Sequence, residues 1–170
     1  PFDAVAALAR FNFVPQAGAV VRRAALLEAG GYDEALRLSE DYDLWLRVAL
    51  RGPFLFVPAV TLHRREHEAQ ASRAAAGMFT NMWRHRLRLV ERLAGEPSRR
   101  AAVLEALATA AQLDLRDAWN AGDREAFHAV LAAVSQVPPA APVAARWARR
   151  ERLAWGAWHG LRRLRHALRR

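Results

Sequence analysis

Cysteine and lysine are both missing from this chain of 170 residues. Without cysteine, it can form neither a disulfide scaffold nor a thiolate metal site. It also lacks a run of roughly 18 uninterrupted apolar residues, the length that a membrane-spanning helix needs. The sequence opens at Pro1, with no signal peptide of the basic, apolar and small-residue kind. We therefore expect a piece of a longer protein, without a membrane span of its own.

Positive charge is concentrated at one end of the chain. All 26 basic residues are arginine, and the formal net charge is +9. Residues 1–143 carry 17 arginines against 16 acids, whereas residues 144–170 carry 9 arginines against Glu151 alone. Binding of nucleic acid over the whole surface is disfavoured, because it needs a basic face on the folded body. The basic tail needs an explanation of its own.

The expected secondary structure is mixed at first and helical afterwards. Short apolar runs bounded by turn residues predict strands in the first two-fifths of the chain. Helix formers that end at glycine or begin at proline predict helices in both parts. The expected strands are 17–21, 54–57 and 59–64, and the expected helices are 22–29, 40–50, 69–93, 97–120, 124–136 and 144–168.

The helix expected from residue 40 begins with an unusual group of acids. Ser39 is a residue type that caps helix N-termini, and Glu40, Asp41 and Asp43 follow in the first turn. Carboxylates there interact favourably with the positive end of the helix dipole. These acids can therefore be explained by capping and charge balance alone.

Four motifs follow one another in the first two-fifths of the chain. They are a small-residue loop around Gly18 that leads to Arg22-Arg23, the turn Gly30-Gly31-Tyr32-Asp33-Glu34, Glu40-Asp41 followed by Asp43-Leu44-Trp45-Leu46-Arg47, and Arg65-Glu66-His67. In this order and spacing they resemble the second half of family 2 glycosyltransferases, a large nucleotide-sugar-dependent group with the GT-A fold. The resemblance covers about residues 10–73.

This resemblance implies an α/β fold class that is mostly helical in the present chain. A partial GT-A-like catalytic half with a few short strands is followed by an α-helical C-terminal extension. The family's nucleotide-binding half, with its Asp-x-Asp motif, is expected upstream, so the fragment alone should be inactive. The expected division is 1–73, the acceptor side with the catalytic base; 74–136, a helical extension; 137–143, a Pro-rich linker; and 144–170, a basic amphipathic helix.

The resemblance gives catalytic roles to the Glu40-Asp41 pair. Glycosyl transfer to a hydroxyl with inversion needs a carboxylate that takes the acceptor proton. In such enzymes the Asp of the Glu-Asp motif is this base, which corresponds to Asp41. Asp43 lies two residues further on and faces another side, so we expect it to pair with an arginine.

The resemblance further implies a metal and substrate site near the last motif. His67 would be a ligand of a divalent metal, Mn²⁺ or Mg²⁺, whose main ligands lie in the upstream half. Arg65 would contact the donor diphosphate. The alternative for both is an exposed polar loop. The sequence gives no role to four further histidines: His85, His128, His159 and His166.

Gly18 and Trp45 are the remaining candidates for substrate binding. Gly18 would let the backbone approach the donor sugar or the acceptor, and its alternative is a simple tight turn. Trp45 would stack against a sugar, although its helical spacing with neighbouring apolar residues also predicts a place in the core.

The tail from residue 144 has the pattern of an interfacial membrane helix, with arginines opposite an apolar face that contains tryptophan. The alternative is a terminal helix packed on the body or a partly disordered tail. The expected apolar face consists of Trp147, Ala154, Trp158, Leu161, Leu164 and Leu168, with Arg149, Arg152, Arg163 and Arg170 opposite.

The sequence therefore predicts part of an inverting glycosyltransferase, with a nucleotide-sugar donor and a glycan or lipid-linked acceptor. Cell-surface polysaccharide or glycolipid synthesis in a bacterium would suit it, at the cytoplasmic face of an anionic membrane. The alternative is a non-catalytic helical, membrane-associated interaction module. A tail that binds single-stranded nucleic acid comes third, because arginine and tryptophan suit that ligand too.

Overall fold

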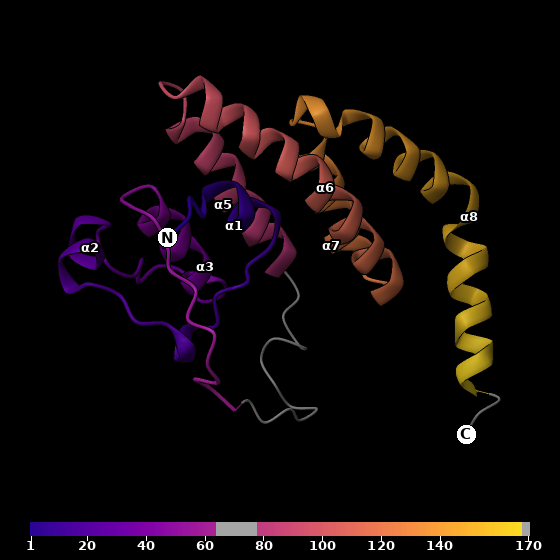
Figure 1. Ribbon diagram of the computed structural model, residues 1–170. Coiled ribbons are helices and arrows are strands. Elements are labelled where there is room, and N and C mark those ends of the chain that lie inside the picture. The colour runs from indigo at the N-terminus through magenta and orange to yellow at the C-terminus, as the bar shows by residue number, and fades with distance from the viewer. Residues whose placement is uncertain (64–77, 168–170) are drawn as a thin grey trace.

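The computed structural model describes residues 1–63 and 78–167, and gives only the backbone of residues 157 and 160–167 (Figure 1). Its elements, in chain order, are α1 (Val5–Arg10), η1 (Gln16–Gly18), α2 (Arg23–Glu28), α3 (Glu40–Ala49), α5 (Met78–Arg92), α6 (Pro97–Ala121), α7 (Arg124–Val134), η2 (Pro138–Ala140) and α8 (Ala141–Ala167), where η marks a 3₁₀ turn.

The strands expected at 17–21, 54–57 and 59–64 do not form in the described residues. The only pairing between extended segments there is an isolated antiparallel bridge, in which Phe2 and Phe54 exchange N–H···O bonds of 2.8 and 2.9 Å. Beyond it, Leu55 and Phe56 are 71% and 75% exposed. A strand needs a neighbour for its backbone groups, and these apolar residues have none in the described part. The α/β component of the predicted fold is therefore not confirmed, and the described chain is mostly helical.

Helix α6 is the central element of the helical part and contacts α1, α5, α7 and η2. Pro97 stands at its start, where a missing N–H costs no hydrogen bond, and Gly122 ends it with a left-handed φ of 77°. Many of its buried side chains are alanine, so neighbouring helices approach closely. The buried residues of α6 are Val103, Leu107, Ala110, Ala111, Leu115, Ala118 and Trp119.

A buried arginine joins the first part of the chain to α6. Arg86 on α5 is 1% exposed; its Nε donates to the Tyr42 hydroxyl at 3.1 Å, and its Nη2 donates to the Arg10 carbonyl at 3.2 Å. Its Nη1 forms an ion pair with Asp114 of α6, which also accepts the Trp83 indole N–H at 2.9 Å. Burial alone would lower the pKa of Arg86, but its interactions with Tyr42 and Asp114 outweigh burial and raise that pKa.

The Pro-rich segment 137–143, expected as a linker, is packed in the structure. Val137 and Ala140 are buried, and η2 contacts α6 and continues directly into α8. Proline at the start of a helical turn removes no hydrogen bond, which is why this segment begins a helix. The tail is thus attached to the body through a folded turn.

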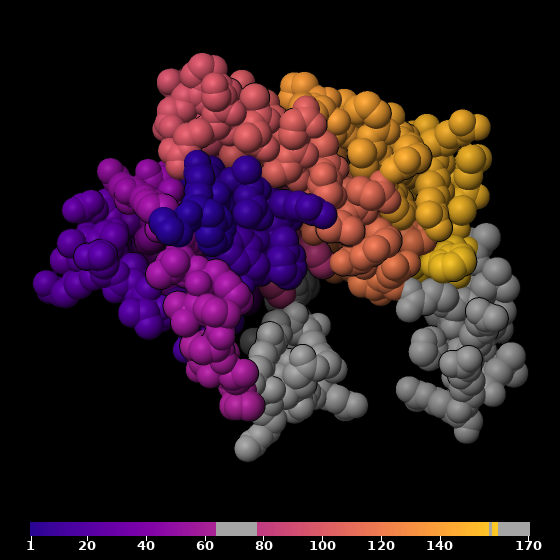
Figure 2. Space-filling view, viewed as in Figure 1, coloured from indigo at the N-terminus to yellow at the C-terminus, as the bar shows by residue number. Residues whose placement is uncertain are grey.

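Helix α8 packs on the body through aromatic side chains. Trp147 is 4% exposed, and the ring of Trp119 on α6 lies 5.8 Å from that of Trp147 and 4.9 Å from that of Trp155. The rings of Phe127 and Trp155 are 5.3 Å apart. Figure 2 shows the first part of α8 lying along the surface of the preceding helices. This is the arrangement of the packed terminal helix, the alternative to a free amphipathic tail.

Some charged side chains of α8 interact with other residues of this chain. The Arg150 guanidinium lies 5.0 and 4.9 Å from the rings of Trp119 and Trp147, and Arg124 of α7 forms an ion pair with Glu151 at 2.6 Å. Within the described residues, no helix is both long and apolar enough to traverse a bilayer.

Candidate functional site

The start of α3 carries the acids that the sequence analysis singled out. Ser39 precedes them in a left-handed conformation, with φ 60° and ψ 25°. Its hydroxyl donates to the Leu38 carbonyl at 2.5 Å and caps none of the helix N–H groups, so the predicted Ser39 cap is wrong. The Asp41 carboxylate accepts the Tyr42 N–H instead, at 2.7 Å. The left-handed turn rotates the serine side chain away from the helix end.

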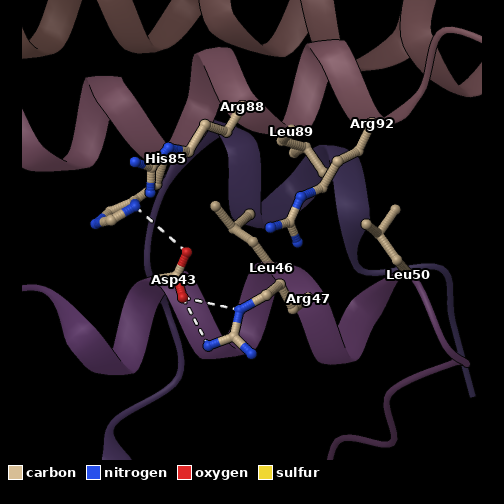
Figure 3. Close-up of a pocket in the computed structure, with 8 residues that line it drawn as sticks. All are labelled: Asp43, Leu46, Arg47, Leu50, His85, Arg88, Leu89 and Arg92. Carbon is tan, nitrogen blue, oxygen red and sulfur yellow. Dashed lines mark hydrogen bonds and ion pairs between the residues drawn. The ribbon is translucent and has the colours of Figure 1, made fainter. Parts of the chain in front are cut away.

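Asp43 is buried, and both of its carboxylate oxygens lie close to basic side chains, as Figure 3 shows. Its Oδ2 lies 2.8 Å from Nε and 2.6 Å from Nη2 of Arg47, and its Oδ1 lies 3.4 Å from Nδ1 of His85. Burial would raise the pKa of Asp43, but the contacts with His85 and Arg47 lower it to about 2. The predicted pairing with an arginine is confirmed. A carboxylate held in this way does not take up a proton near neutral pH.

Glu40 and Asp41 are in a different environment. Both side chains are only partly buried, and neither has an ion-pair partner among the described residues. They are the two acids of the first turn of α3 that remain available to another molecule.

The glycine turn contacts α3 and is itself connected to the loop around Gly18. The Nη1 of Arg47 donates to the Ala29 carbonyl, directly before the turn in which Gly30 and Gly31 have φ values of 88° and 66°. Such values are accessible to glycine at little cost, which explains the glycine pair. Next to it, the Tyr32 hydroxyl accepts a hydrogen bond from the Gln16 amide at 2.9 Å, which connects the turn to η1.

Gly18 lies against the chain that leads into the last motif. A Cβ at this position would come within 3.3 Å of the Thr61 hydroxyl oxygen and 3.8 Å of the Leu62 Cβ. The glycine thus allows close approach of residues 61–62, and its contact with a substrate stays a prediction. Arg65 and His67 lie outside the described residues. In the part of the chain that is described, no three His, Asp or Glu side chains come together as metal ligands.

Trp45 belongs to the core. It is 4% exposed, so its ring faces are covered by protein and offer no stacking surface to a sugar in this structure. The core alternative of the sequence analysis describes it correctly, and the substrate-binding role of Trp45 has no support from its position. Packing between α3 and its neighbours is what buries this side chain.

His85 is a residue of this site that the sequence analysis missed. It is 2% exposed, and its ring lies between two side chains of the α3 region: Nε2 is 3.2 Å from the Ser39 Oγ, and Nδ1 faces Asp43. A sequence pattern could have indicated it, because His85 lies four residues before Leu89 on the buried face of α5. A polar residue on such a face usually has a polar partner.

A shallow pocket opens between α3 and α5 beside these residues. Its enclosed volume of about 10 Å³ is close to that of one water molecule, so it is too small for a sugar nucleotide. The residues that line it are Asp43, Leu46, Arg47, Leu50, His85, Arg88, Leu89 and Arg92 (Figure 3).

Comparison with known families tests the resemblance independently. Residues 2–94, more than half of the chain, match the model of the family described as glycosyltransferase like family 2. The chain belongs to this family. No curated protein and no solved structure matches it.

The glycosyltransferase-like region reaches further than the motifs alone. The match runs to residue 94 and includes all of α5, and with it His85 and Arg86. Asp114, the ion-pair partner of Arg86, lies beyond the matched residues. An ion pair therefore connects the family region of this chain to α6, which lies outside the match.

Proposed function

We propose that this chain provides the acceptor side of an inverting glycosyltransferase, with Asp41 as the general base. The contrast between two acids two residues apart supports the proposal most directly. Asp43 is buried against Arg47 and His85, whereas Asp41 is partly exposed and has no cationic partner among the described residues. Membership of the family supports a glycosyltransferase role, and the position of Asp41 in the Glu-Asp motif agrees with it.

The proposed reaction has one bond forming and one breaking. The oxygen of an acceptor hydroxyl attacks the anomeric carbon of the donor sugar, and the bond from that carbon to the nucleoside diphosphate breaks. The diphosphate leaves with the bonding electron pair, and the acceptor proton passes to the Asp41 carboxylate. Attack opposite the leaving group inverts the anomeric centre. Glu40, the other partly exposed acid, would orient the acceptor or support the charge of the site.

Substrates and cofactor belong to the same proposal. A nucleotide-sugar donor and a glycan or lipid-linked acceptor, used in cell-surface polysaccharide or glycolipid synthesis, fit the family. Within residues 1–63 and 78–156, no three His, Asp or Glu side chains come together as metal ligands. His67 as a ligand of Mn²⁺ or Mg²⁺ remains a proposal, and the metal titration of His67→Ala should differ from that of the wild type if it is correct.

The test compares carboxylates within the intact enzyme. Asp41→Asn should lower turnover by about 10²–10⁴-fold, the usual effect of a positioned proton acceptor, with donor binding retained. Asp117→Asn on α6, where Asp117 is exposed and paired with Arg116, is the matched control and should keep wild-type turnover. Wild-type turnover in Asp41→Asn would remove Asp41 from the mechanism.

Attachment to an anionic membrane through residues 144–170 is a second proposal. It is supported by the exposed side chains of Arg149, Arg152 and Leu153 on α8, the last of them 74% exposed. Trp147 and Trp155 are engaged with the body, so the arginines would supply most of the attraction. Co-sedimentation with anionic vesicles should fall steeply with salt and should weaken in Arg149→Gln/Arg152→Gln. Preferential binding to RNA would instead favour the nucleic-acid alternative.

A further inference from the structure

The backbone at Ser39 is held in a conformation that few side chains adopt. Ser39 is the non-glycine residue with positive φ in the described part of the chain, and such residues persist where surrounding contacts fix them. Its carbonyl accepts the Asp43 N–H at 3.1 Å, at the start of α3. The orientation of Ser39 therefore sets the first helical turn, which carries Glu40 and Asp41.

The two ring nitrogens of His85 lie beside two different side chains of the α3 region. The single hydroxyl proton of Ser39 is donated to the Leu38 carbonyl, so Oγ is left to accept at its 3.2 Å contact with Nε2. Nδ1 faces an oxygen of Asp43 at 3.4 Å. The imidazole thus lies between Ser39, which precedes α3, and Asp43 in its first turn.

The charges around His85 come from both helices. Asp43 faces the imidazole, and Arg47 of α3 and Arg88 and Arg92 of α5 line the same pocket. The edge of the Tyr42 ring lies against the imidazole, with centroids 6.4 Å apart. The Asp43 carboxylate is thus the side chain of α3 that contacts both His85 and Arg47.

Serine, histidine and aspartate in this order would suggest a nucleophilic triad. Two observations argue against that role here. The Ser39 hydroxyl is donated to a carbonyl, and Ser39 does not line the pocket that reaches His85 and Asp43. The contacts of Ser39 therefore stabilise a backbone turn, and they do not activate its hydroxyl oxygen as a nucleophile.

We propose that His85 is a positioning residue of the transferase. Its imidazole contacts Ser39 on one side and Asp43 on the other, and so fixes the first turn of α3 that presents Asp41. This role rests on the proposed function of Asp41, but the effect of His85 on the turn can be measured without any substrate. Loss of the imidazole removes both contacts and loosens the turn.

Amide hydrogen exchange on the intact protein tests whether His85 stabilises the first turn of α3. In His85→Gln the amides of Asp43 and Leu44 should exchange about tenfold faster than in the wild type, the usual effect of losing a hydrogen bond to a charged group. Amides of α6 should be unaffected. His159→Gln, which removes another buried histidine far along the chain, should leave the exchange of these two amides unchanged.

Ser39→Gly is the second variant, because glycine keeps the left-handed backbone without the hydroxyl. It should fold, and because it removes the contact with His85, the amides of the first turn should again exchange faster than in the wild type. Wild-type exchange of the first turn in both variants would overturn the proposal, and so would an equal loss of protection in every helix.

Turnover separates this inference from the function on which it rests. His85→Gln should lower kcat and leave KM nearly unchanged, because Asp41 is displaced while the binding groups remain. Wild-type kcat in His85→Gln together with an inactive Asp41→Asn would overturn the positioning role. Wild-type kcat in both would overturn the function of Asp41.

Discussion

The family region, residues 2–94, and the helices after it, residues 97–167, are stabilised by different means. In the described part of the first, α1, α2 and α3 have only 6 to 10 residues each, and buried polar contacts such as Arg86 with Tyr42 link the elements. In the second, long helices meet through alanines and an aromatic cluster around Trp119. Side chains with specific partners hold the candidate site, whereas periodic apolar packing holds the extension.

Removing the buried charge between the two regions should have the largest effect. Arg86→Met leaves Asp114 without its partner in the interior, and breaking a buried ion pair costs about 3–5 kcal/mol. We expect chemical denaturation to show this loss in the free energy of unfolding. Arg116→Met, at an exposed pair with Asp117, should change it by less than about 0.5 kcal/mol. Arg86→Met/Asp114→Leu should recover part of the loss, and a double variant no more stable than Arg86→Met would show that the pair is not the cause.

Truncating a side chain of the aromatic cluster should have the next largest effect on the stability of the protein. Trp147→Ala removes a side chain that is 4% exposed and should cost about 3 kcal/mol, near the lower end for a buried tryptophan because α8 can shift toward the body. Leu153→Ala on the same helix, at a side chain 74% exposed, is the control and should be almost neutral. Thermal unfolding of both variants measures the difference. Equal stability would mean that α8 is not part of the folded body.

The smallest effect should be the pH dependence that comes from Asp43. Its pKa is about 2 in the folded protein against an ordinary 3.8, which corresponds to roughly 2 kcal/mol of stability. Because the folded pKa is the lower one, this stability is complete above about pH 5 and is lost as pH falls toward 2. The wild-type advantage over Asp43→Asn should therefore shrink across that range. Asp117→Asn should show no such convergence, and a constant difference for Asp43→Asn would contradict the pairing.

Local sequence signals predicted four of the helices closely and missed α1. Helices expected at 22–29, 40–50, 97–120 and 124–136 are present, with ends within two residues of those predicted. Each has a local cause in the chain, such as Pro97 at the start of α6 or Gly122 after its end. Glycosyltransferase family membership was also predicted correctly, because ordered motifs are visible in a single sequence.

What the sequence could not show depends on contacts between distant residues. The segment 54–57 has the composition of a strand, but pairing needs a neighbour. Ser39 is a common capping residue, and its left-handed turn accompanies a contact with His85, which is 46 residues away. Pro138 can end one helix or start another, and packing on α6 makes it a start.

The ion pair between Arg86 and Asp114 also sets an order of events during synthesis. The two residues are 28 positions apart, so at ordinary translation rates the ribosome adds the aspartate a few seconds after the arginine. During that interval every residue matched to the transferase family has been made, yet its buried guanidinium has no carboxylate to face. The contact between Arg86 and Asp114 can therefore form only once α6 has been made, after the last residue of the family region.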